Sequence, residues 1–198
     1  IARLLLLFIH VTAFAVALGC VLREDAKLVS ARPIDPPSLR EAARLVRFAL
    51  ILLWPSGAAL IVFDTGGPLL AVADNPKLLA KLTVVCVLTL NGIALHTVAF
   101  PALCGEASFG SHGAAVAAGL GGISAASWFA ATLLGIARMQ ARGFDYTDFM
   151  VAYAGIGAIA LGFALLFVRP RLVRKLAAGA RWGTARLERG GADLPRLQ

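Results

Sequence analysis

The sequence predicts an all-α fold, a polytopic transmembrane helical bundle of about five spans. Of its 198 residues, 59% are hydrophobic and 15% are charged, whereas soluble domains average about 45–50% apolar and about 25% charged residues. Five apolar runs stand out, at about 2–22, 42–63, 77–103, 112–137 and 149–168. Each run has the roughly 20 residues that cross a hydrocarbon core. The sequence therefore predicts a transmembrane domain over 1–168 and a basic tail over 169–198.

The first run, IARLLLLFIHVTAFAVALGC, has one basic residue at its front, as a signal peptide does. It has no A-x-A cleavage site before a polar region, so we interpret it as a span. The sequence starts at Ile1 rather than at methionine, and we expect the native start to be missing.

Helix-start signals precede three of the later spans. Ser38, with Glu41 three positions on, predicts a capping box for the second span. Similar signals precede the third and fifth spans: Pro76 behind Asp74 or Asn75, and Asp145 or Thr147.

Lysine and arginine are distributed unevenly between the two sides of the predicted bundle. The first loop and the tail carry 14 of them and the opposite side carries 5. The positive-inside rule then predicts a cytoplasmic C-terminus. The net charge of +8 favours contact with anionic lipid at that face. No basic patch interleaves with aromatic residues, so we expect no nucleic-acid partner.

The start of the tail has an apolar face, formed by Leu172, Val173 and Leu176. Two readings stay open for it, an amphipathic helix on the membrane surface and a solvated, partly disordered tail. After Gly190 we expect disorder.

The third span carries Lys81, Asn91 and His96, although polar side chains are expensive in hydrocarbon. Lys81 lies near the outer end, where a lysine reaches the interface. At 100° per residue, His96 shares a helix face with Val85, Thr89 and Gly92. This face should point to other helices. Asn91 lies about 140° away from His96 around the helix, so we expect it to bond to a different helix.

His10 lies near the middle of the first span, on a face with Leu6, Ala13 and Ala17. An intramembrane histidine is a functional candidate. Two readings stay open, a cofactor ligand or proton relay and a histidine bonded to a carbonyl or hydroxyl. A haem with His10 and His96 as its two axial ligands needs both at one depth. Counted from the inner ends, their depths differ by roughly 8 Å, so depth does not favour this pairing.

Small residues recur every four positions in the last two spans: Ala117, Gly121 and Ala125, then Ala154, Ala158 and Gly162. This spacing lets helices approach closely. It indicates packing within the bundle, with a homo-oligomer or a larger membrane complex as the alternative.

Other chemistry has weak support in the sequence. We expect Cys20, Cys86 and Cys104 to be free thiols, because no CxxC pair occurs. His112 shares its predicted side with Cys20, Glu24, Cys104 and Glu106, but this spacing is not diagnostic of a metal site. Two methionines, Met139 and Met150, argue against a copper(I) path. The sequence contains no catalytic motif, and the predicted spans contain no carboxylate.

The first half of the chain resembles a group of small bacterial membrane proteins that includes the CopD-type copper proteins and the HemJ-type protoporphyrinogen oxidases. The resemblance rests on LLLLFIHVTAFAVALG, LVRFALILLWPSGAAL and KLTVVCVLTLNGIALH. It implies that His10 corresponds to a haem-ligating histidine and Lys81 to a third-span lysine. His96 lies about a turn later than the third-span histidine of the HemJ-type proteins.

Together these observations predict a multi-pass protein of the bacterial inner membrane. The leading hypothesis is a haem-b-binding or redox-linked protein that uses His10, with His96 as a second ligand or proton relay. The alternatives are a non-catalytic subunit or scaffold of a larger complex and a metal or small-solute permease.

Overall fold

The computed structural model describes residues 1–30, 32–66, 72, 74–104, 111–137 and 143–178. The helical elements in this part of the chain are α1 (Ala2–Val29), α2 (Pro36–Thr65), α3 (Pro76–Ala94), η2 (Leu95–Ala99), α4 (Phe100–Leu103), α5 (Ser111–Ile136), α6 (Tyr146–Phe163) and η3 (Ala164–Val168). The described residues contain no strand. Five helices are long and apolar enough to cross a membrane, which confirms the all-α bundle and supports an integral membrane protein.

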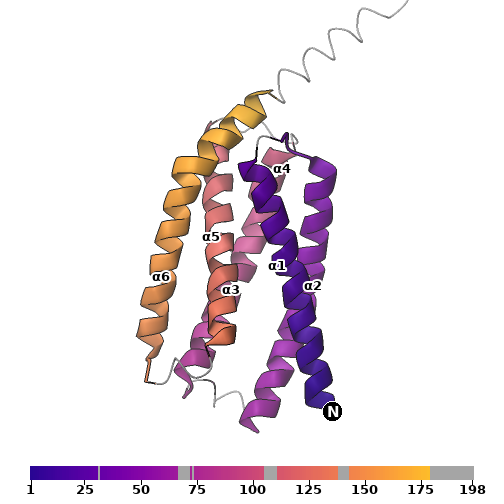
Figure 1. The fold of residues 1–198 in the computed structure, drawn as a ribbon, viewed down its shortest axis with the longest axis vertical. Coiled ribbons are helices and arrows are strands. Elements are labelled where there is room, and N and C mark those ends of the chain that lie inside the picture. Colours follow the sequence, from indigo (N-terminus) through magenta and orange to yellow (C-terminus); the bar gives the residue numbers. More distant parts are fainter. Residues whose placement is uncertain (31, 67–71, 73, 105–110, 138–142, 179–198) are drawn as a thin grey trace, which may run out of the picture.

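α1 and α2 form one tightly packed pair, and α3, α5 and α6 pack against one another (Figure 1). α1 packs along α2 through small and branched side chains, among them Ala17 and Leu53. α5 approaches α6 so closely that a Cβ built on Gly122 would lie 3.0 Å from the Ala160 carbonyl oxygen. α3 packs against both α5 and α6.

One end of the bundle gathers the basic residues that flank the first two helices. Here α1 ends at Val29, α2 begins at Pro36, and the last helix reaches residue 178. We call it the basic end; it is at the top of Figure 1.

α2 begins about six residues earlier than the apolar run predicted. Pro36 and Pro37 occupy the first helical positions, where the missing N–H of proline is not needed. Ser38 therefore lies inside the helix, Asp35 is the N-cap, and the predicted capping box with Glu41 is wrong. The Ser38 hydroxyl instead faces α1.

The other predicted helix starts are confirmed. The Asn75 side chain accepts a hydrogen bond from the Leu78 N–H at 3.1 Å, with Pro76 at the first position of α3. The Asp145 N–H donates to the Asp148 carboxylate at 2.9 Å in the cap of α6. Local side-chain chemistry therefore sets where these two helices begin.

The first ten residues of the predicted tail continue the last helix and dock on the bundle. Leu172 is 1% exposed and packs in a core cluster with Leu39 and Ala99. The Lys175 ammonium donates to the carbonyls of Lys27 and Leu28, both at 2.9 Å. The segment expected to be disordered, after Gly190, lies outside the described residues.

Candidate functional site: a cavity between the spans

A cavity of about 750 Å³ lies among the five spans and borders every one of them. On α5 its lining extends from Ala117 to Thr132, which is about 22 Å along the helix axis at 1.5 Å per residue. Most of its lining side chains are apolar. The volume lies within the range of about 300–1,000 Å³ that is common for ligand sites.

The cavity is open on the side where α1 and α6 face each other. Its lining includes Leu22 of α1 and both Ile159 and Phe163 of α6. These side chains are 58%, 77% and 50% exposed, respectively. A rim of exposed apolar side chains on a membrane-spanning bundle faces hydrocarbon. The opening therefore leads into the bilayer.

Both π-helical segments contribute to this cavity. η2 provides Leu95 and His96, and η3 provides Ala164 and Val168. Short π segments within α-helices are rare and are frequent at functional sites. Their position indicates that the helices deviate from regular geometry where they line the cavity.

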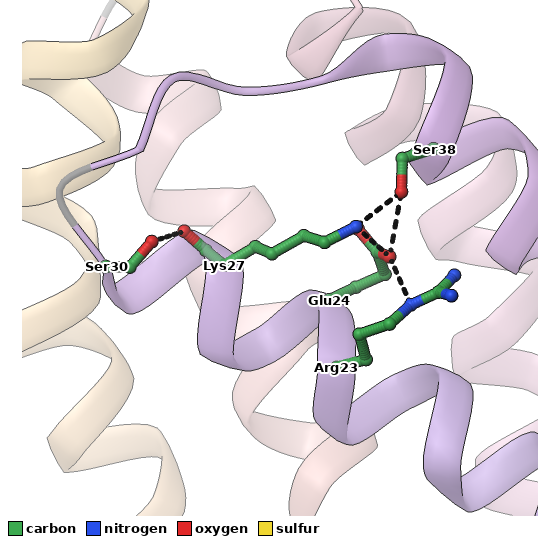
Figure 2. Close-up of polar contacts among 5 residues, drawn as sticks. All are labelled: Arg23, Glu24, Lys27, Ser30 and Ser38. Atoms are coloured by element: carbon green, nitrogen blue, oxygen red, sulfur yellow. Dashed lines mark hydrogen bonds and ion pairs between the residues drawn. The ribbon is translucent and has the colours of Figure 1, made fainter.

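At the basic end of the cavity, a polar cluster around Glu24 connects α1 to α2 (Figure 2). Glu24 is 9% exposed, and its carboxylate accepts from Arg23 Nε at 3.1 Å and Lys27 Nζ at 2.9 Å. The Ser38 hydroxyl donates to the same carboxylate at 3.1 Å. Two cations and one hydroxyl thus contact Oε1 of Glu24, and the cluster ties α1 to the first turn of α2.

Polar side chains without a hydrogen-bond partner among the described residues also line the cavity. Within the described part of the chain, no hydrogen bond or ion pair reaches Asp25, His96 or Ser124. His96 packs only edge-on against the Phe100 ring, with 4.9 Å between the centroids. Ser124 is 8% exposed. None of these polar atoms is both fully buried and unpaired, so they are accessible from the cavity, where a ligand with polar atoms can meet them.

His10 is paired within the bundle and does not line this cavity. Its Nδ1 lies 2.9 Å from the Ser56 hydroxyl of α2. That hydroxyl donates to the Leu52 carbonyl at 2.6 Å, so it accepts from Nδ1–H. A Cβ on Gly57 would lie 3.2 Å from the imidazole. Of the two readings of His10, its contacts match the histidine bonded to a hydroxyl.

The two candidate haem ligands lie at different depths. His10 is level with Ser56, whereas Gly92 is level with Leu50, since its added Cβ would lie 4.0 Å from Leu50 Cδ1. Ser56 is about 9 Å along α2 from Leu50, and His96 is about 6 Å beyond Gly92 in the opposite direction. The separation in depth is therefore roughly 15 Å. The structure does not bring both imidazoles to one iron, and the donor set of the cavity fits haem only through His96.

The remaining polar groups of the third span bond to neighbouring helices. Asn91 is buried, and its amide donates to the Leu120 carbonyl of α5 at 3.0 Å, which confirms the predicted interhelical bond. Thr89 accepts from Trp54 Nε1 of α2 at 3.2 Å. The helix face that includes Thr89 and His96 therefore contacts α2 at Thr89 and borders the cavity at His96.

The residues considered for a metal site do not come together in the described part of the chain. No group of three or more His, Cys, Asp or Glu side chains suited to a metal ion is found there. His112 is exposed, Cys20 and Cys104 are free, and Glu24 is committed to its cluster. Glu106 lies outside the described residues.

The two small-residue faces have different surroundings. Ala117, Gly121 and Ala125 of α5 line the cavity, and Ala117 also packs in a core cluster with residues of other helices. On α6, Ala154 and Ala158 are exposed on the outer surface of the bundle. The close approach between these helices uses Gly122, one position beside the predicted face.

Comparisons of the chain with protein-family models, curated protein sequences and solved structures found no match.

Proposed function

We propose that this integral membrane protein binds a hydrophobic ligand, which enters its central cavity sideways from the bilayer. The observation that carries this proposal is the apolar cavity of about 750 Å³, with its exposed apolar rim on α1 and α6. Cavities of this size and lining are typical of sites for small molecules and cofactors.

The chemistry of the lining favours a hydrophobic occupant. Water needs about two to four polar partners per molecule, and most of the lining side chains are apolar. A hydrophobic molecule matches this lining better than water does.

Among hydrophobic ligands, haem b is the cofactor that the resemblance of the sequence suggests. Here His96 would be its protein ligand, because its imidazole lines the cavity and no hydrogen bond to it is found among the described residues. Bound haem supplies one-electron redox chemistry, which the redox-linked hypothesis requires. Absorption spectra of the oxidised and reduced protein test for haem, and a Soret band lost in His96→Ala but kept in His10→Ala would assign the ligand.

We also propose that the protein lies in the inner membrane of a bacterium. Its basic end then faces the cytoplasm. The charge difference between the two sides, 14 against 5 Lys and Arg residues, supports this orientation. The wide opening then lies within the membrane. Cysteine accessibility on the two sides tests the orientation.

A paired substitution tests ligand binding in the cavity. Gly121 lines the cavity, and a Cβ added to it meets no atom within 4 Å. Gly121→Leu should therefore fill space that the ligand occupies. Gly155 of α6 is exposed outside the cavity and is equally uncrowded, so Gly155→Leu is the matched control.

Native mass spectrometry of the purified variants measures the hydrophobic molecules that each retains. Gly121→Leu should retain fewer than the wild type, and Gly155→Leu should retain as many. Equal retention by Gly121→Leu would contradict the proposal.

A second role, as a subunit that associates with another membrane protein, is favoured by the outward small-residue face of α6. Ala154 and Ala158 are exposed there, and nothing lies within 4 Å of a Cβ added to Gly162. Small residues at this spacing support helix association in membranes. Ala158→Phe should lower the oligomer mass in mild detergent, and an unchanged mass would remove this face as the contact.

A further inference from the structure

Asp25 lies at the basic end of the cavity, half-buried, with its carboxylate unpaired among the described residues. Its neighbour Glu24 differs, since Arg23, Lys27 and Ser38 all donate to that side chain. Of two adjacent carboxylates, one is balanced by the chain and the other faces an apolar space. A carboxylate partly removed from water is costly unless it meets a cation or hydrogen-bond donors.

Three basic groups at this end of α1 have other partners. Arg23 and Lys27 bind Glu24, and the Lys175 ammonium binds the carbonyls of Lys27 and Leu28. None of these three cations pairs with the Asp25 carboxylate. A ligand that enters the cavity is in the position to supply a positive charge there.

Two further unpaired polar groups lie deeper in the same cavity. Glu24 is level with Ser38, and His96 lies about one turn nearer to the basic end than Leu50, so Asp25 and His96 differ in depth by roughly 13 Å. Ser124 of α5 is 8% exposed and lies farther from the basic end than His96 does. The polar atoms are thus spaced along an apolar path. This pattern suits a long molecule with a polar head, further polar atoms below it and an apolar body.

We propose that the occupant is a membrane lipid with an ammonium headgroup. The ammonium pairs with Asp25 at the basic end, the His96 imidazole donates to an ester carbonyl, and the acyl chain lies along α5. The apolar rim of Leu22 and Ile159 indicates that the source is the bilayer rather than the aqueous phase. This inference rests on the proposed function, because it needs a hydrophobic ligand in the cavity.

The charge of the head separates this ligand from haem. An ammonium is attracted by the Asp25 carboxylate, whereas the anionic propionates of haem are repelled by it. Neutralising Asp25 should therefore weaken binding of the ammonium lipid and should not weaken binding of haem. The direction of this change identifies the class of ligand.

The test uses the full chain reconstituted in vesicles of equal parts phosphatidylethanolamine and phosphatidylglycerol with identical acyl chains. Native mass spectrometry then measures the ratio of the two lipids retained by the protein. We expect the wild type to favour phosphatidylethanolamine roughly tenfold, the effect of one charge-assisted hydrogen bond. Asp25→Asn should bring the ratio close to parity. Glu41→Gln removes an exposed carboxylate of α2 that does not line the cavity and should leave the ratio unchanged.

The outcomes separate this inference from the proposed function. A wild-type ratio near one, or a wild-type ratio that persists in Asp25→Asn, overturns the ammonium lipid. If Gly121→Leu loses both lipids while Asp25→Asn keeps the ratio, the cavity binds lipid and only the headgroup assignment fails. If Gly121→Leu retains both lipids as the wild type does, the retained lipid lies outside the cavity and both proposals fail.

Discussion

Gly122 and Gly121 provide a matched test of how the last two helices pack, because neighbouring glycines meet different surroundings. A Cβ on Gly122 would lie 3.0 Å from the Ala160 carbonyl oxygen and 3.0 Å from the Ala164 Cβ. A Cβ on Gly121 would meet nothing within 4 Å. We predict that Gly122→Ala is less stable than Gly121→Ala, although both remove a glycine from the same helix.

The size of the effect follows from these distances. Replacing glycine with alanine in a helix stabilises by about 0.8–1 kcal/mol, and this gain is common to both variants. Carbon atoms prefer separations of about 3.5–4.0 Å, so α6 must move outward by roughly 0.5–1 Å at Gly122. Overpacking of this kind costs about 1–3 kcal/mol. The free energies of unfolding of the two variants should therefore differ by about 1–3 kcal/mol.

Thermal unfolding in mild detergent, followed by tryptophan fluorescence, measures this difference. Trp128 lies on α5, is 2% exposed and packs 5.3 Å from the Phe14 ring, so its emission reports separation of the helices. For a chain of this size the Tm of Gly122→Ala should lie roughly 2–12 °C below that of Gly121→Ala. Equal Tm values would show that α6 is not held against Gly122, and the packing argument would fail.

Three further predictions concern polar contacts between helices. Ser56→Ala removes the hydroxyl that accepts from His10 and should lower the free energy of unfolding by about 1 kcal/mol in the same assay. Asn91→Leu removes one amide donation to the Leu120 carbonyl and should cost only about 0.6–1 kcal/mol, the usual value within membranes, so a loss of several kcal/mol would indicate a larger role. Lys175→Met frees the last carbonyls of α1 and should speed amide hydrogen exchange in the C-terminal helix, whereas unchanged exchange would show that this contact does not hold it.

The spans were predictable because their signal is local. An apolar run of about 20 residues fixes a membrane helix whatever its neighbours are. The interhelical bond of Asn91 was predictable for the same reason, since its angle from His96 follows from the helical repeat alone. The first span was predicted to end near residue 22, yet α1 continues to Val29. Its added turns carry Arg23 and Lys27, which neutralise Glu24 within the helix.

The cavity was not predictable, because it depends on the distance between α1 and α6, which no sequence pattern encodes. For this reason the sequence ranked His10 as the first candidate, whereas the structure pairs His10 with Ser56 and places His96 in the cavity. Asp25 had a weak signal, an acidic pair at the end of an apolar helix. Only the contacts of Glu24 show that Asp25 is the carboxylate without a partner among the described residues.

The small residues of α5 account for both the tight contact and the open space. In a lipid environment small side chains permit close approach, but only where a second helix is present to approach. On one side α6 meets Gly122 at contact distance. On the cavity side, α1 is bound to α2 along its length and through the Glu24 cluster, so it does not move toward α5. The small side chains there leave volume, and the lining residues that leave it are Ala117, Ala118, Gly121, Ala125 and Ala126. A larger residue at Gly121, where an added Cβ would meet no atom within 4 Å, would reduce the cavity. A face that is typical of helix packing is therefore also what gives the site its size.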